Sequence, residues 1–174
     1  MGNKNEGEDG YTIDSLKRMK AVSTSNKKVL SKFVKKVERL KPGKIDGIFH
    51  NAHYEEFERI DCLECANCCS SISPILYMVD IERIASHLKI KSAVLIEKYL
   101  YVDDEGDYVF KYTPCPFLGE GNYCDIYDVR PRACREYPHT DRKRIYQILN
   151  KTKKNYHYCP AVFNIIESLR DELH

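Results

Sequence analysis

Four cysteines lie within eight consecutive residues of this 174-residue chain, at a spacing that could hold a metal ion. The stretch runs from Cys62 to Cys69 and reads CLECANCC. Thiolates are strong nucleophiles and soft metal ligands. In a C-x-x-C turn two sulfurs can converge on one ion while backbone N–H groups point at them, and this spacing occurs twice in succession here. The pattern therefore indicates a zinc or iron–sulfur site.

Cys68 and Cys69 are neighbours in the chain, which limits how both can act as ligands. Adjacent side chains point to opposite faces of a strand, or diverge by about 100° on a helix, so the two cannot easily share one tetrahedral ion. They serve two ions, or one is a ligand and the other is a packed or redox thiol. A disulfide framework is the alternative for the whole block, and a reducing compartment disfavours it.

Four further cysteines follow at wider intervals. Cys115, Cys124 and Cys134 each lie beside a turn former or a predicted helix start, where free N–H groups can stabilise a thiolate. Cys159 precedes Pro160 and an amphipathic helix, whose positive end should point at the Cys159 sulfur. Eight thiolates could fill two four-coordinate sites, one [4Fe-4S] cluster plus a zinc, or one cluster with spare redox cysteines.

The order of these motifs resembles a known family. The match covers about residues 60–162 and consists of Cys62-x-x-Cys65-x-x-Cys68-Cys69, Cys115-Pro-Phe-Leu, Cys124-x-Ile-Tyr, Arg130-Pro-x-x-Cys134-Arg-x-Tyr-Pro and Cys159-Pro. It resembles the CxxCxxCC zinc- or iron-chelating family, the YkgJ-like cysteine cluster proteins. The resemblance implies a metal-binding protein whose ligands are the eight cysteines of these motifs. Similar cysteine motifs occur in the flagellin lysine N-methylases.

Three arginines surround Cys134, namely Arg130, Arg132 and Arg135. A zinc ion or a [4Fe-4S] cluster with four thiolates carries a formal charge of about −2, so nearby positive charge would help to hold it. An anionic substrate or cofactor group could also pair with a guanidinium fork. Arg130 and Arg135 belong to the matched motif and are the predicted cofactor-binding residues, whereas Arg132 is as readily an ordinary surface residue.

Two functions from different classes are compatible with these residues. The first is an accessory or binding protein, whose metal centre organises a surface for a protein partner or carries metal or electrons. The second is a protein lysine methylase-like enzyme that uses S-adenosylmethionine beside an iron–sulfur cluster. The chain has no glycine-rich methyltransferase loop, which favours the first function. Iron–sulfur is placed slightly ahead of zinc, because the spacing of Cys62, Cys65 and Cys68 resembles the start of the bacterial ferredoxin run.

Length, net charge and the lack of long apolar stretches limit the classes of protein to which the chain could belong. Its length fits one domain, and a net charge of +2 gives no reason to invoke nucleic acid or an anionic membrane as the main partner. No stretch approaches the ~20 apolar residues of a membrane span, and the first residues lack a signal-peptide core. We expect a cytoplasmic protein with a disordered tail at residues 1–11 and a single domain at 12–174.

Periodicity predicts the elements that position the cysteines. The clearest helix buries Val29 to Leu40 and should end at Pro42-Gly43, and Ser23-Thr24-Ser25 should cap it. Asp46 should cap a third helix, which carries His50 and His53 as surface or packing residues. Asp80 and Ser92 should cap two short helices, and residues 101–110 read as a hairpin. The predicted fold is a mostly helical α+β domain with small β-hairpins around a cysteine-ligated metal centre.

Overall fold

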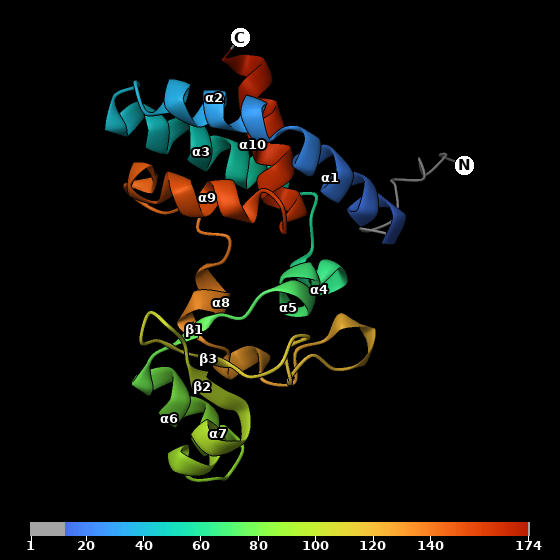
Figure 1. The fold of residues 1–174 in the computed structure, drawn as a ribbon, viewed down its shortest axis with the longest axis vertical. Helices are drawn as coiled ribbons and strands as arrows, with labels where there is room; N and C mark the ends of the chain where they lie inside the picture. Colours follow the sequence, from blue (N-terminus) through green and yellow to red (C-terminus); the bar gives the residue numbers. More distant parts are fainter. Residues whose placement is uncertain (1–12, 174) are drawn as a thin grey trace, which may run out of the picture.

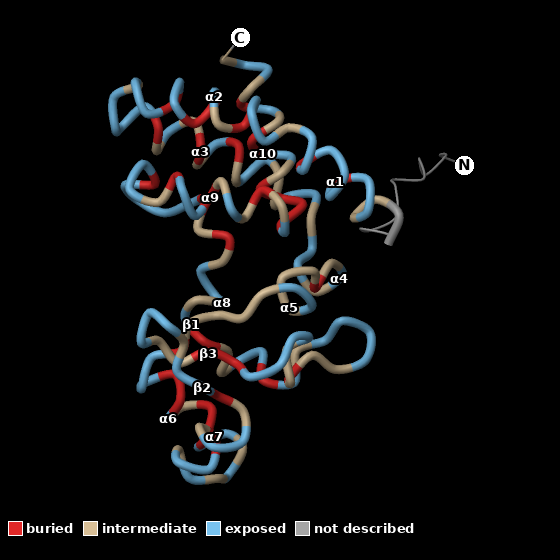
Figure 2. The backbone as a smooth tube through the Cα atoms, in the orientation of Figure 1, coloured by how far each residue is buried: buried red, intermediate tan, exposed pale blue. Residues whose placement is uncertain are grey.

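The computed structural model describes residues 13–173, so the tail expected at residues 1–11 lies outside the described residues. It confirms a mostly helical α+β fold with a small antiparallel sheet. Two hydrophobic cores lie toward opposite ends of the long axis of the molecule, with short helices between them (Figures 1 and 2). We call these regions the helical half, the sheet half and the middle layer.

The helical half buries the apolar faces of amphipathic helices against one another. On its second helix Leu30, Phe33, Val34 and Val37 point into the core, and the lysines of the same helix face solvent. The half consists of α1 (Ile13–Ser25), α2 (Lys27–Val37), α3 (Pro42–Phe57), the 3-10 helix η3 (Ile145–Ile148), α9 (Leu149–Asn155) and α10 (Pro160–Glu172). Both ends of the described chain therefore belong to it (Figure 1).

Two predictions about these helices are wrong. Pro42 does not end α2, which stops at Val37; it is the first residue of α3, where its fixed φ and missing N–H are tolerated. Asp46 lies inside α3 rather than at its start. Its carboxylate accepts hydrogen bonds from the backbone N–H groups of Arg144 at 2.7 Å and Ile145 at 2.9 Å, so it caps η3 instead.

The start of α2 also differs from the prediction. The residue before the helix is Asn26, and α1 continues through Ser25. The hydroxyls of Ser23, Thr24 and Ser25 donate to carbonyls three or four residues earlier in α1. These residues therefore extend the first helix and do not cap the second.

The sheet half consists of three short antiparallel strands covered by two helices. Its elements are β1 (Ile75–Leu76), α6 (Met78–His87), α7 (Ser92–Tyr99), β2 (Leu100–Val102) and β3 (Tyr108–Phe110). The strand order is β1-β3-β2, and Tyr101 faces Val109 across the predicted hairpin, which is confirmed. β1 was not predicted, because two residues are too few to show an alternating pattern.

The helix caps in the sheet half are shifted from the predicted positions. Asp80 is the third residue of α6, where its carboxylate accepts the backbone N–H of Tyr77 at 3.1 Å. Ser92 is the first residue of α7, and Lys91 is at the N-cap position. Asp80 thus stabilises the same helix terminus as predicted, from within the first turn.

Five of the eight cysteines lie on helices of the middle layer. It contains α4 (Cys62–Cys65), α5 (Asn67–Ser71), the 3-10 helices η1 (Glu120–Asn122) and η2 (Tyr127–Val129), and α8 (Arg132–Glu136). The chain enters this layer after α3 and returns to the helical half after α8 (Figure 1). Figure 2 shows exposed and half-buried residues in this layer, between the two buried cores. None of the helices in the described residues is long and apolar enough to cross a membrane.

Candidate metal centre

All eight cysteines are free thiols gathered on the middle layer and its borders. Cys62 and Cys65 begin and end α4, Cys68 and Cys69 lie on α5, and Cys134 lies on α8. Cys159 is the buried N-cap residue of α10, while Cys115 and Cys124 pack against the core of the sheet half. Apart from the exposed Cys62 and the buried Cys159, these thiols are half-buried.

A single residue separates the two turns of the first cysteine block. Ala66 lies between α4 and α5 with φ of 41°, in the left-handed region that alanine rarely adopts. This conformation ends α4 after Cys65 and starts a new helix at Asn67. The reversal lets the sulfurs of the two short helices face a common region instead of winding around one continuous helix.

Hydrogen bonds between distant segments bring the other cysteines to this block. The backbone N–H of Cys115 donates to the carbonyl of Cys69 at 2.8 Å. A β-bridge between Leu118 and Cys124 closes the turn that carries Cys124. On the opposite border, the Asn67 side chain donates to the carbonyl of Tyr158 at 2.5 Å, beside Cys159. The Cys115–Cys69 and Asn67–Tyr158 hydrogen bonds join residues that are 46 and 91 positions apart in the chain.

An ion pair between the buried Asp80 and the half-buried Arg83 fixes the segment that leads into Cys134. Arg83 donates to Asp80 at 2.5 Å and to the carbonyl of Arg130 at 2.9 Å. The Asp80 oxygen that pairs with Arg83 also accepts the backbone N–H of Arg132, in α8, at 3.0 Å. Asp80 and Arg83 thereby tie α6 to the first turn of α8 and set the position of Cys134.

Several sulfurs accept hydrogen bonds from backbone N–H groups two or three residues further along the chain. The donors are Asn67 for Cys65, Phe117 for Cys115, Ile126 for Cys124, and Ala161 with Val162 for Cys159. Each of these hydrogen bonds lowers the pKa of its thiol, because it stabilises the thiolate. At Cys159 the donors belong to the first turn of α10, as the sequence predicts. The layer is therefore shaped to hold thiolates.

Burial opposes ionisation in the metal-free protein. It is the main cause that raises the pKa of Cys115 to about 11 and those of Cys134 and Cys159 to about 12. Cys69 behaves differently: the Cys68 sulfur lies 3.9 Å away, and its hydrogen bond lowers the pKa of Cys69 to about 7. A bound cation would supply the positive charge that the other thiols need in order to ionise.

The sulfurs lie near one another without forming a closed cage. Among the described residues, no group of three or more cysteine, histidine, aspartate or glutamate side chains is placed to hold an ion as the side chains stand. The donor types nevertheless fit zinc or iron, because both metals bind thiolates and the N–H groups already point at several sulfurs. Loading would require side-chain movements that bring the sulfurs together.

The three arginines of this region have different surroundings. Arg130 is half-buried, its guanidinium lies 3.7 Å from the centre of the Tyr127 ring, and its charge lowers the pKa of Cys62, Cys124 and Cys134. Arg132 pairs with Glu136 at 2.5 Å on the surface. Arg135 is exposed on α8. The structure therefore brings Arg130 to the cysteines, and cofactor binding by Arg130 and Arg135 stays a prediction.

Sequence reasoning missed Tyr137 as a functional residue. Its buried hydroxyl has no hydrogen-bond partner of normal geometry. Burial raises the pKa of the Tyr137 hydroxyl, and the neighbouring thiols of Cys159, Cys68 and Cys65 raise it further. The phenol therefore stays protonated among these sulfurs. The only signal in the sequence was its place in the Cys134-Arg-x-Tyr-Pro motif.

The two histidines of α3 make packing contacts within the helical half. His53 lies 2.7 Å from the Thr140 hydroxyl and stacks on Phe57 with 4.4 Å between ring centres. The Nε2 atom of His50 lies 3.1 Å from the carbonyl of Arg142. These contacts agree with the prediction that they are surface or packing residues.

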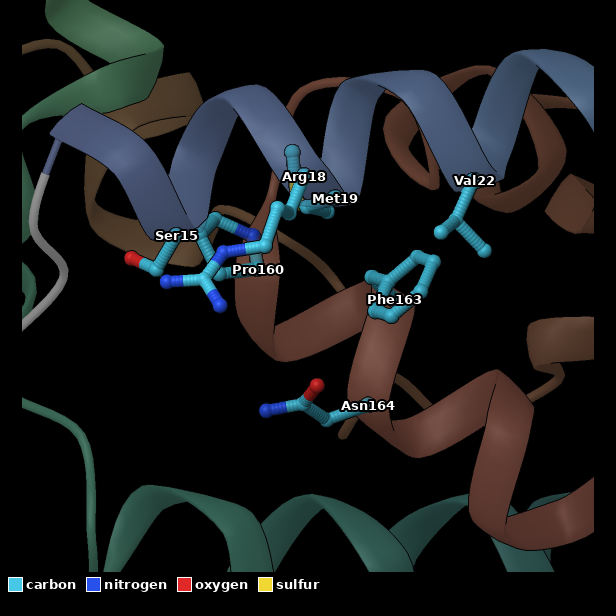
Figure 3. A pocket seen from close by; sticks show the side chains of 7 residues that line it. All are labelled: Ser15, Arg18, Met19, Val22, Pro160, Phe163 and Asn164. Carbon is cyan, nitrogen blue, oxygen red and sulfur yellow. The ribbon is translucent and has the colours of Figure 1, made fainter.

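Two recesses open on the helical half. One, of about 280 Å³, lies between α1 and α10 and is lined mainly by Met19, Val22, Pro160 and Phe163 (Figure 3). The other, of about 250 Å³, lies between α3 and α10 and is more polar. Pro160, the residue after Cys159, lines the first recess, but no cysteine lines either recess.

Comparison with known proteins agrees with the cysteine geometry. No curated protein and no solved structure matches the chain. One family model matches residues 61–160, which include every cysteine of the chain, and its description is "CxxCxxCC: Putative zinc- or iron-chelating domain". The match covers more than half of the sequence. The chain therefore belongs to the CxxCxxCC family of zinc- or iron-chelating domains.

Proposed function

We propose that this protein holds zinc or an iron–sulfur cluster through its cysteine thiolates and acts as an accessory or binding protein in a reducing compartment such as the cytoplasm. The observation that carries the proposal is the set of backbone N–H groups aimed at Cys65, Cys115, Cys124 and Cys159. Such groups stabilise thiolates, the form that binds metal, at positions where burial favours the neutral thiol. All eight cysteines being free supports metal ligation over disulfide bonding.

The accessory role is preferred because the chain has no glycine-rich methyltransferase loop. The recesses between α1 and α10 and between α3 and α10 are lined without a cysteine, so neither would place a substrate beside a cysteine-bound metal. No contact of the described residues favours S-adenosylmethionine binding or lysine methylation. The proposal therefore gives the centre a structural, metal-carrying or electron-carrying role.

Anaerobic purification from iron-replete cells followed by elemental analysis tests this function. We expect stoichiometric iron with a brown colour that bleaches in air, or stoichiometric zinc in a colourless protein. Removing the metal should reduce the helical circular dichroism signal, because ligand binding and folding of the middle layer are coupled. His50→Ala is the matched control and should retain the metal. Protein without stoichiometric zinc or iron would overturn the proposal.

A further inference from the structure

Two lysine-rich helices that are distant in the sequence lie side by side in the helical half (Figure 1). α2 has the sequence KKVLSKFVKKV and α9 the sequence LNKTKKN, so together they carry eight lysines and no acidic residue. The two helices contact each other, and the Lys153 ammonium donates to the Ser31 hydroxyl at 2.8 Å. The fold therefore joins two short charge runs, and we call the solvent-facing side chains of α2 and α9 the basic surface.

The lysines of the basic surface point into solvent without acidic partners. Lys28, Lys32 and Lys35 are exposed and recur every three or four residues, so they form a row on the side of α2 opposite its buried residues. Lys151 and Lys154 are exposed on α9. Among the described residues, no carboxylate forms an ion pair with a lysine of either helix. The positive charge of the surface is therefore available to a partner.

The small net charge of the chain conceals this concentration of charge. The eight lysines exceed the net charge of +2, so the remaining residues of the sequence are net negative when taken together. A surface of one sign steers the association of a protein with partners of the opposite sign. We therefore expect the partner of the basic surface to be a polyanion.

The composition of the surface narrows the kind of polyanion. Val29 is the one exposed large apolar residue within α2 and α9, and neither helix has an exposed aromatic residue or an arginine. Membrane-bound helices insert several apolar side chains, single-stranded nucleic acids stack on aromatic rings, and protein interfaces use aromatic or arginine anchors. A lysine ammonium binds phosphate as a point charge. The surface therefore fits the phosphates of a nucleic-acid duplex best.

The row on α2 has a length that suits a duplex backbone. Lys28 and Lys35 are seven residues apart. This separation is about 10 Å along a helix that rises about 1.5 Å per residue. Phosphates on one strand of B-DNA recur about every 3.4 Å along the axis, so the row spans about three base pairs. Duplex RNA is recognised through its 2′-hydroxyls as well as its phosphates, whereas a surface of ammonium groups needs phosphates alone.

We propose that the basic surface binds the phosphate backbone of double-stranded DNA without reading its base sequence. Lys28, Lys32 and Lys35 contact phosphates from α2, and Lys151 and Lys154 contact phosphates from α9. Phosphate contacts of this kind position a protein on DNA and carry no direct sequence information. The binding belongs to the helical half and adds a partner to the proposed accessory role of the metal centre.

Fluorescence anisotropy with a labelled 20-base-pair DNA duplex tests the proposal on the full-length protein as purified. If five lysines contact phosphates, log Kd should rise with log[NaCl] with a slope of about 4.5, and affinity should fall about 500-fold between 50 and 200 mM NaCl. Two duplexes of unrelated sequence should bind equally. Lack of binding at 50 mM NaCl, or a preference of more than about tenfold for one sequence, would overturn the proposal.

Variants that remove charge test the named residues. Glutamine has nearly the helix propensity of lysine, so the triple variant Lys28→Gln, Lys32→Gln, Lys35→Gln should fold normally, as checked by circular dichroism. Its salt slope should be lower than that of the wild type by about 3. The double variant Lys151→Gln, Lys154→Gln should lower the slope by about 2. An unchanged slope in folded variants would show that these lysines do not contact DNA.

The matched control removes the same charge from the sheet half. Lys89, Lys91 and Lys98 are exposed there, and changing all three to glutamine should leave both the affinity and the salt slope unchanged. A loss equal to that of the α2 triple variant would mean that binding follows net charge alone, which would overturn the assignment to the basic surface.

Other anionic probes separate the competing partners. They are duplex RNA and single-stranded DNA of the same sequence, poly-glutamate, and vesicles containing phosphatidylserine, all compared at one salt concentration. We expect each to bind more weakly than the DNA duplex, and tighter binding of any of them would overturn the proposal. The metal content of the same preparation reports on the cysteine centre separately, so DNA binding and metal binding can each fail alone.

Discussion

At the scale of single residues, the cysteines differ most in their ionisation. The Cys68 hydrogen bond lowers the pKa of Cys69 to about 7. Cys62 is exposed as a residue, but partial burial of its sulfur raises the pKa of its thiol. The thiolate is the reactive form of cysteine. We expect iodoacetamide at pH 7.5 to alkylate Cys69 of the metal-free protein before Cys62, as measured by tandem mass spectrometry. Earlier modification of Cys62 would show that exposure outweighs ionisation.

The raised pKa values also predict how zinc binding depends on pH. Cys115, Cys134 and Cys159 have pKa values of about 11 to 12, so protons compete with the metal at these sulfurs throughout the neutral range. Zinc affinity should rise between pH 6 and 8, by about tenfold per pH unit for each proton displaced. The contribution of Cys69 should level off above about pH 7, because its proton is already lost there. Competition titration against a chelator measures this; an affinity independent of pH would contradict it.

Tyr137 should affect the metal-free and metal-loaded protein in opposite ways. Its hydroxyl is buried without a partner, so Tyr137→Phe should stabilise the metal-free protein by about 1 kcal/mol in chemical denaturation. The same change should weaken zinc binding, because the phenol lies among Cys65, Cys68 and Cys159 and can donate to a metal-bound thiolate.

Tyr156→Phe is the matched control for this change. The Tyr156 hydroxyl donates to Glu167 at 2.5 Å in the helical half, so its loss should destabilise the protein by about 1 kcal/mol and leave zinc binding unchanged. Equal effects of the two variants on zinc affinity would show that Tyr137 acts only through general stability.

At the scale of elements, the junction between α6 and α8 depends on Asp80. Asp80→Ala would leave Arg83 without its ion partner and would remove the acceptor of the Tyr77 and Arg132 N–H groups. We expect a loss of about 2 kcal/mol in the free energy of unfolding, because two backbone N–H groups lose their acceptor and the half-buried Arg83 loses its partner. Zinc binding should also weaken.

A surface ion pair on α8 provides the comparison. Glu136→Ala removes the partner of Arg132, whose side chain is 66% exposed, and should leave both measurements unchanged. Similar losses in Asp80→Ala and Glu136→Ala would show that the junction does not depend on the Asp80–Arg83 pair.

The elements also show what the sequence can and cannot predict. Periodicity found α2 and α10 and the β2–β3 hairpin, because their apolar positions repeat locally. The role of Asp46 could not be found in this way, since its partners Arg144 and Ile145 are 98 and 99 residues away. The cysteine types and spacings identified every candidate ligand. Which hydrophobic core Cys159, Cys115 and Cys124 border depends on packing between distant segments, and no local pattern encodes that.

At the scale of the whole molecule, the middle of the chain is inserted into a unit formed by its two ends. The helical half takes α1 to α3 from one end and η3 to α10 from the other. Every cysteine except Cys159 lies in the inserted part. Cys159 is therefore the cysteine through which a bound metal would connect the inserted segment to the core of the helical half.

This arrangement determines the path of a mechanical load. α1 and α10 contact each other, so tension applied to the two ends of the chain enters through one and leaves through the other. The cysteine-bearing segment lies outside that path until the packing of the helical half ruptures. In an optical trap we expect a first rupture whose force is insensitive to chelator, followed by a second whose force falls when the metal is removed. A chelator-sensitive first rupture would mean that the thiolates bear the load from the start.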